Sequence, residues 1–364
     1  MNQRTRCLEV RRNDLRTTRI VEAALPELSP GQALLRIDRF GLTSNNVTYG
    51  VTGDVIGYWG FFPAAQGWGR VPAWGFAEVS QSRVDGLRMG ARVYGFLPMA
   101  DHVIVEPTRV SAHGFVDGAA HRAKLPSTYN RYQFTDSDPL YSSKTEGLQS
   151  VLVPLFVTSF FIDDFLADND DFGAQRVIVS SASSKTAAGT ALFLSRRQGH
   201  RPEVVGLTSP GNVGFVEGLG CYDQVLTYDN LEALDPSAAT VYVDIAGSAT
   251  VRSTIHHHLG DALRYSSAVG MAHWEDPPNK GELAGPKPTF FFAPSQVEKR
   301  LSEWGSAGYQ QRLAAAWQEL LEVAGNWVSI VDVPGLDNVP DVFGRLIDGA
   351  AQPRDAFVVD TRAQ

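Results

Sequence analysis

The residues with the most evident chemical potential lie in a short turn that follows an apolar strand. Residues 176–180 form a β-branched run that is typical of a buried strand. Hydroxyl groups, backbone N–H groups and a lysine ammonium follow it, and each of these can bind a phosphate oxygen. A plain tight turn without a ligand is the alternative. We predict a site for a phosphorylated ligand at Ser181, Ser183, Ser184, Lys185 and Thr186.

The elements around this turn follow the order strand, helix, strand, helix, strand. A helical pattern covers 188–198, a second strand covers 203–207, a second helix ends at Gly220, and a third strand covers 224–226. This order places a helix N-terminus at the carboxyl edge of a parallel sheet, where phosphate groups bind. A P-loop is excluded, because the glycines that should precede Lys185 are absent.

The segment 217–228 reads Glu-Gly-Leu-Gly-Cys-Tyr-Asp-Gln-Val-Leu-Thr-Tyr and resembles the medium-chain dehydrogenase/reductase superfamily. It is most similar to the zinc-free, quinone-reductase-like branch, and within that branch to a bacterial group known only as a domain of unknown function. The resemblance implies an α/β fold, with a Rossmann doubly wound parallel sheet plus a GroES-like antiparallel β-barrel domain. It implies a barrel (substrate) domain at 1–149 and 327–364, and a nucleotide-binding domain at 150–326.

The resemblance also implies a dinucleotide cofactor, although the phosphate-binding turn departs from the family pattern. Ser181, Ser184 and Ala187 stand where the superfamily has glycines, which let the backbone approach a pyrophosphate closely. No carboxylate ends the second strand to repel a 2′-phosphate, so NADP(H) is favoured over NAD. Against NADP(H), residues 208–216 contain no Arg or Lys. By position in the relatives, the remaining cofactor-binding residues are Thr208, Ser209, Asn212, Tyr228 and Gly270.

The activity implied by the resemblance is a metal-free reduction by NADPH of an activated C=C or carbonyl group, of the enone or quinone kind. The substrate is expected to be small and apolar or aromatic. This chemistry needs a donor to the developing oxyanion, and Tyr49, Asn46 and Lys144 are the candidates by position. Two alternatives stay open: a hydrolase or lyase on a scaffold that has lost dinucleotide binding, and a non-catalytic ligand-binding or structural protein. No Gly-x-Ser-x-Gly motif supports the hydrolase.

Two further segments allow a functional and a structural interpretation. Residues 58–74 carry six aromatic side chains among glycines and prolines. They can line a pocket over an aromatic substrate, or they can form a satellite core or a dimer contact. Residues 108–147 look like an insertion relative to ordinary reductases, and long ordered loops are usually functional. A lid or specificity loop is one interpretation, and an excursion that packs on its own domain is the other.

The sequence predicts no metal site. The loop at 43–50 offers only hydroxyl and amide groups where zinc-dependent relatives place a cysteine, and two cysteines are too few for a four-cysteine zinc lobe. His113 and His121 lack a third ligand at metal spacing. Residues 256–258 are three histidines, but consecutive helical side chains diverge by about 100° and cannot converge on one ion. We expect these histidines to be solvated or half-buried.

Composition indicates a soluble globular protein. The chain has 364 residues, of which 43% are hydrophobic and 20% charged, which is enough for two ordinary domains. A net charge of −8 with scattered Lys and Arg argues against nucleic-acid and anionic-membrane partners. The longest apolar run, 151–161, is shorter than the ~20 residues of a membrane span, and no signal segment is visible. Two cysteines fit a reducing compartment, so we expect a cytoplasmic protein, and a homodimer by resemblance.

Overall fold

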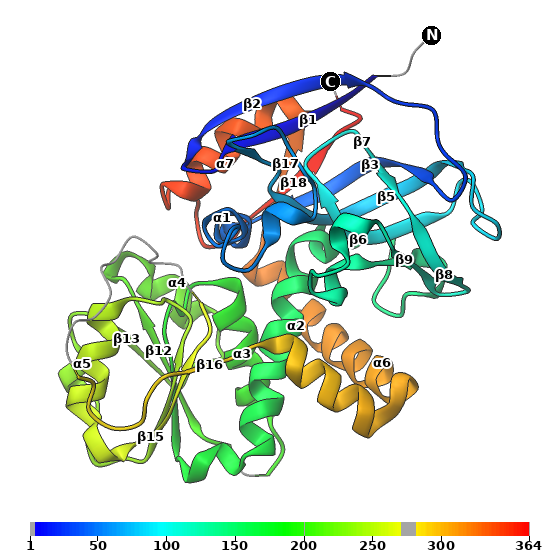
Figure 1. The fold of residues 1–364 in the computed structure, drawn as a ribbon. Helices are drawn as coiled ribbons and strands as arrows, with labels where there is room; N and C mark the ends of the chain where they lie inside the picture. The colour runs from blue at the N-terminus through cyan, green and yellow to red at the C-terminus, as the bar shows by residue number, and fades with distance from the viewer. Residues whose placement is uncertain (1–3, 200, 271–281, 364) are drawn as a thin grey trace. The chain divides into compact units, whose positions relative to one another are not determined.

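The chain divides into two compact units in the computed structural model, which describes residues 4–199, 201–270 and 282–363 (Figure 1). The first unit comprises Met1–Pro154 and Ser329–Gln364, and the second comprises Leu155–Val328. The sequence predicts boundaries after residues 149 and 326, which lie a few residues before those of the compact units.

The first unit is built from two sheets of mainly antiparallel strands. The smaller sheet has the order β2-β1-β4, and the larger has the order β17-β18-β3-β5-β6-β10-β9-β8, with β7 paired to β3. Only β17 and β18 run parallel among these pairs. The strands are β1 (Arg4–Arg11), β2 (Asp14–Ala24), β3 (Ala33–Leu42), β4 (Trp68–Gly69), β5 (Pro72–Ser82), β6 (Arg92–Pro98), β7 (His102–Val105), β8 (Pro107–Ser111), β9 (Gly114–Asp117), β10 (Arg131–Phe134), β17 (Ser329–Pro334) and β18 (Asp355–Asp360). The helices are α1 (Ser44–Val51) and α7 (Val339–Ile347).

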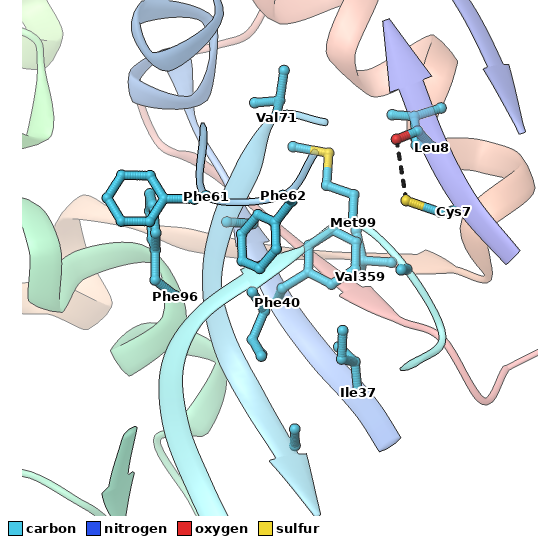
Figure 2. Packing of buried hydrophobic residues seen from close by; sticks show 14 of the residues in the cluster. Cys7, Leu8, Ile37, Phe40, Phe61, Phe62, Val71, Phe96, Met99 and Val359 are labelled. Atoms are coloured by element: carbon cyan, nitrogen blue, oxygen red, sulfur yellow. Dashed lines mark hydrogen bonds between the residues drawn. The ribbon is translucent and has the colours of Figure 1, made fainter. Parts of the chain in front are cut away.

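The core of this unit contains most of the aromatic segment at 58–74. Figure 2 shows Phe61 and Phe62 packed with Phe96 and Phe40 on the larger sheet. Four of the six aromatic side chains, Tyr58, Trp59, Phe61 and Phe62, are buried in this cluster. Burying a large apolar side chain stabilises a fold by roughly 1.5–3 kcal/mol. The interpretation of this segment as part of a core is therefore correct for these four side chains. Trp68 and Trp74 are half-buried.

The insertion at 108–147 is part of the larger sheet. Strands β8, β9 and β10 extend that sheet beyond β6, and a buried ion pair within the insertion packs against the aromatic core. The Nε atom of Arg122 lies 3.1 Å from Oδ2 of Asp117, and both side chains are about 2% exposed. The guanidinium also lies 4.7 Å from the ring centre of Phe62. The segment thus packs on its own unit, as the second interpretation expects.

The second unit is a six-stranded parallel sheet with the order β13-β12-β11-β14-β15-β16. Figure 1 shows α5 on one face of this sheet and α3 on the other. The chain moves outward from β11 to β13 and then returns to β14 beside β11, so the strand order reverses between β11 and β14. Ligands of open α/β sheets bind at such a switch point, outside the carboxyl ends of the strands. The strands are β11 (Arg176–Val179), β12 (Glu203–Thr208), β13 (Gln224–Thr227), β14 (Thr240–Asp244), β15 (Leu263–Ala268) and β16 (Thr289–Phe290).

The helices of this unit lie before, between and after the strands in the chain. The last of them is broken at Gly305, whose φ of +67° is not helical, and the sequence predicts a break at this place. The helices are α2 (Glu146–Asp168), α3 (Lys185–Arg196), α4 (Val213–Gly218), α5 (Ala249–Leu259) and α6 (Ala293–Trp327).

Helix α2 is longer than the apolar run that the sequence suggests. Within the described residues, it is the one helix with the length and composition to cross a membrane, and half of its most apolar window is buried inside the structure. Its Phe156 ring lies 5.9 Å from Phe193 of α3 and 5.3 Å from Trp317 of α6. A core helix passes the same length and composition test, so this feature is weak evidence for a membrane.

We predict that Arg122→Met lowers the free energy of unfolding by about 3–5 kcal/mol, because it leaves the Asp117 carboxylate buried without a counter-charge. Urea titration followed by tryptophan fluorescence measures this loss. The control is Arg88→Ala, which removes an ion pair to Asp136 whose side chains are 73% and 79% exposed; its expected effect is about 0–1 kcal/mol. Equal losses in the two variants would show that the buried pair has no special role.

Candidate functional site

The carboxyl ends of β11 and β14 are tied together by one serine hydroxyl. Ser180, which follows β11, is fully buried. Its Oγ donates to Oδ1 of Asp244 at 3.1 Å and accepts from the backbone N–H groups of Ile245 and Ala246 at 3.0 and 2.9 Å. These bonds join the two strands at the switch point of the sheet.

The Asp244 carboxylate is saturated by its neighbours. Oδ1 also accepts from the Tyr242 hydroxyl at 3.0 Å and from the N–H of Gly247 at 2.9 Å, while Nε of Arg252 donates to Oδ2 at 2.8 Å. These partners occupy the oxygen atoms of Asp244. The carboxylate therefore holds the neighbouring backbone in place and is not a ligand-binding group. Ser180, Tyr242 and Arg252 are not among the residues that the sequence predicts for this site. The sequence does show an aspartate, Asp244, at the end of an apolar strand. Its hydrogen-bond partners could not be found from the sequence, because several of them lie on other elements.

The turn after Ser180 adopts a backbone conformation that suits glycine. Ser181 has a φ of +54°, which is left-handed and costs an ordinary residue roughly 1–2 kcal/mol. Its N–H donates to the Tyr228 hydroxyl at 2.9 Å, and its carbonyl accepts from the N–H of Ser184 at 2.7 Å. Ser181 stands where the superfamily has its first glycine. It therefore has the left-handed backbone conformation that is typical of glycine, although it is a serine.

The next residues form the beginning of α3. Ser184 is its N-cap, and its Oγ accepts from the N–H of Ala187 at 3.3 Å. Ala187 is fully buried, so a small residue is retained where the helix packs. Lys185 and Thr186 lie in the first helical turn, where backbone N–H groups point outward and favour an anion. A serine oxygen that accepts a hydrogen bond still has its own proton to donate.

A second hydrogen-bonded group joins the ends of β11 and β12. The Asn212 side-chain amide donates to Oγ of Ser183 at 3.2 Å and to Oγ of Ser209 at 3.1 Å. Thr208 ends β12, and its carbonyl accepts from the N–H of Tyr228 at 3.2 Å. The structure therefore brings Ser183, Ser209 and Asn212 into direct contact, with Tyr228 bonded to both neighbouring segments.

Gly270 completes this edge of the sheet after β15. Its N–H donates to the carbonyl of Asp244 at 3.1 Å. A Cβ atom at this position would lie 2.0 Å from the carbonyl oxygen of Ile245, so only glycine fits. All ten predicted cofactor-binding residues belong to the carboxyl edge of the parallel sheet, which is a polar edge with hydroxyl and N–H donors.

In the first unit, the structure surrounds one predicted catalytic residue with hydrogen-bond donors. The Tyr49 oxygen accepts from Nδ2 of Asn45 at 2.7 Å and from Nε1 of Trp74 at 3.3 Å. Burial raises the pKa of Tyr49 far above its ordinary value, and the two donors oppose that rise only in part. The hydroxyl is therefore protonated at neutral pH.

The other two predicted catalytic residues have different surroundings. The Asn46 amide is engaged with backbone at both ends: Oδ1 accepts from the N–H of Thr43 at 2.7 Å, and Nδ2 donates to the carbonyl of Pro72 at 2.9 Å. It caps α1, and the neighbouring Asn45 reaches Tyr49 instead. Lys144 is exposed in a turn before α2. No hydrogen bond or ion pair joins it to Tyr49 in the part of the chain that the structure describes.

The cysteines and histidines have structural partners. Burial raises the pKa of Cys7 and of Cys221 to about 12, so neither is an activated thiol. His256 is fully buried, against expectation, because its ring bonds to the carbonyl of Ala284 at 2.8 Å and to Oγ of Ser266 at 2.9 Å. His258 bonds instead to the carbonyl of Leu234. Within the described ranges, no group of three or more His, Cys, Asp or Glu side chains is placed to hold a metal ion.

Solved structures share this arrangement over nearly the whole chain. CurA from Vibrio vulnificus, crystallised with NADPH, matches with a TM-score of 0.62 at 14% identity, covering 99% of this chain and 100% of that one. The quinone oxidoreductase from Coxiella burnetii matches with 0.56 at 12%, covering 99% and 100%. The human synaptic vesicle membrane protein VAT-1 homolog-like protein matches with 0.56 at 12%, covering 100% of both chains. At these identities the likeness shows the fold alone.

The fold is that of the medium-chain dehydrogenases/reductases: a Rossmann doubly wound sheet plus a GroES-like barrel, as the sequence predicts. A family model described as "Protein of unknown function (DUF2855)" matches residues 40–352. The chain belongs to this family. No curated protein sequence matches it significantly.

We predict that Ser181→Gly raises the free energy of unfolding by about 0.5–1 kcal/mol. Relief of the left-handed strain is partly offset by the greater freedom of glycine in the unfolded chain. Urea titration measures the gain, and Ser181→Ala is the matched control, since it removes the hydroxyl and keeps the strained backbone. If the alanine variant gains as much as the glycine variant, backbone strain is not the cause.

Proposed function

We propose that the protein is an NADP(H)-dependent, metal-free oxidoreductase that reduces an activated C=C or carbonyl group of a small apolar or aromatic substrate. The observation that carries the proposal is the set of hydroxyl and N–H donors at the switch point of a Rossmann sheet, from Ser181 to Gly270. The relatives support it, since CurA was crystallised with NADPH and another is described as a quinone oxidoreductase. The bound cofactor would supply a hydride.

The residues of this edge fit a dinucleotide in two respects. The backbone at Ser181 is left-handed as a glycine turn requires, and the N-terminus of α3 favours the charge of a pyrophosphate. Ser183 and Ser184 would donate their hydroxyl protons to phosphate oxygens, and Lys185 would add a cation. Thr208, Ser209, Asn212 and Tyr228 would hold the 2′-phosphate with neutral hydrogen bonds.

The substrate side of the proposal rests on Tyr49. Addition of a hydride to an enone or quinone leaves an oxyanion, and a proton must follow to complete the reduction. The Tyr49 hydroxyl carries that proton, because burial keeps it protonated. Asn45 and Trp74 donate to its oxygen and would offset part of the cost that burial places on the phenolate, until water returns a proton.

A homodimer in the cytoplasm is part of the same proposal. Strand β16 is an edge of the parallel sheet, and Phe290 on it is 63% exposed. An unpaired edge strand that carries an exposed aromatic side chain is a surface suited to pairing with a second copy.

We predict that the full chain binds NADPH at least about tenfold more tightly than NADH, a difference of ~1.4 kcal/mol. Isothermal titration calorimetry with each nucleotide measures it. Lys185→Ala is expected to weaken NADPH binding by about tenfold through loss of a charge-assisted contact. Lys124→Ala, an exposed lysine of the first unit, removes the same charge and should have no effect.

Absence of binding by either nucleotide contradicts the oxidoreductase proposal. Ester or C–C bond cleavage without a nucleotide would then support the alternative, a hydrolase or lyase that has lost dinucleotide binding. Equal NADPH binding by wild type and Lys185→Ala refutes only the role of the lysine.

We predict that Tyr49→Phe lowers kcat for NADPH-dependent reduction of an enone or quinone by about 10²–10⁴-fold, the usual contribution of a positioned general acid. NADPH affinity should not change. Steady-state assays of nicotinamide absorbance measure the loss. Tyr58→Phe is the matched control, since that ring lies 4.6 Å from Tyr49 and its hydroxyl bonds to Tyr129. A similar loss in both variants would assign the effect to packing of the aromatic rings.

A further inference from the structure

One side-chain amide holds two serine hydroxyls at the carboxyl edge of the parallel sheet. Nδ2 of Asn212 donates to Oγ of Ser183 at 3.2 Å and to Oγ of Ser209 at 3.1 Å. The backbone N–H of Asn212 also donates to the carbonyl of Ser209 at 3.0 Å. These three hydrogen bonds fix the amide between the turn that follows β11 and the turn that follows β12.

These bonds decide the direction of the two serine protons. A hydroxyl group donates one proton and accepts at its oxygen. Because each serine oxygen accepts from Asn212, its own proton points away from the amide. Neither hydroxyl donates to any residue that the structure describes. Ser183 is half-buried and Ser209 is exposed, so a ligand can reach both.

The segment that ends β12 and follows it contains no charged residue. Residues 208–216 have no Lys, Arg, Asp or Glu, so a phosphate beside them meets neither a cation that attracts it nor a carboxylate that repels it. A hydroxyl attracts a phosphate oxygen only when its proton faces that oxygen, since its lone pairs repel an anion. The direction of the serine protons therefore decides whether the hydroxyls attract or repel a phosphate.

We propose that Asn212 is a positioning residue that gives the site its preference for a 2′-phosphate, because its amide turns the Ser209 proton toward that group. Both protons of Nδ2 are used by the serines, so Asn212 acts on the phosphate through them. The same amide orients the Ser183 proton for a second phosphate oxygen. The inference rests on the proposed function and names the residue that sets its cofactor preference.

Asn212→Asp tests this role, because the new side chain has the same shape and the opposite hydrogen-bonding character. A carboxylate can only accept, so the serine protons turn toward position 212, and the added charge repels a phosphate. The full chain is titrated by calorimetry with adenosine 2′,5′-bisphosphate and with 5′-AMP, which differ only in the 2′-phosphate. Wild type should bind the bisphosphate at least about tenfold more tightly, and Asn212→Asp should abolish that preference.

Two further variants separate this role from a structural one. Ser209→Ala removes one oriented proton and should lower the affinity for the bisphosphate by about fivefold to tenfold, with no change for 5′-AMP. Loss of the fold of this turn would instead weaken the binding of both probes. Asn13→Asp makes the same exchange in an exposed turn of the first unit and should keep the wild-type preference.

Equal binding of the two probes by wild type, no binding of either, or an unchanged preference in Asn212→Asp overturns the proposal. The reduction assays with NADPH give an independent result. NADPH-dependent reduction with an unchanged preference in Asn212→Asp overturns the role of Asn212 alone. A preference that Asn212→Asp abolishes, without NADPH-dependent reduction of an enone or quinone, supports the role of Asn212 and contradicts the proposed reductase.

Discussion

The hydrogen bonds of the Ser180 hydroxyl are the constraint on which the proposed nucleotide site depends. One oxygen atom joins the end of β11 to the end of β14 and contacts Asp244, whose charge is balanced by Arg252. Because these strands flank the switch point of the sheet, the tie fixes both walls of the place where ligands of such sheets bind. The turn at Ser181, the start of α3 and Gly270 all follow from segments that this tie positions.

The serines that replace the family glycines are compatible with that arrangement. A glycine provides two things at such a turn: a left-handed backbone and the absence of a side chain. The structure keeps the backbone conformation at Ser181, and Ser184 acts as a helix cap, a role for which serine is well suited. A hydroxyl group takes some space from a phosphate but also offers it a hydrogen-bond donor.

In the first unit, Trp74 joins Tyr49 to the other aromatic side chains, because its indole N–H reaches the Tyr49 oxygen and its ring stacks on Tyr94. The segment at 108–147 contributes Tyr129 to the aromatic cluster and three strands to the larger sheet.

The sequence by itself determined the order of strands and helices around the phosphate-binding turn, and the family, because apolar periodicity, turn residues and helix caps act over short distances along the chain. Only the tertiary structure decided which side chains meet. Ser180 and Asp244 are 64 residues apart in sequence, Asp117 and Arg122 become a buried ion pair only under Phe62, and His256 is buried by a bond to Ser266 on a neighbouring strand. Burial and partner choice depend on the packing of distant segments, and no local pattern encodes that information.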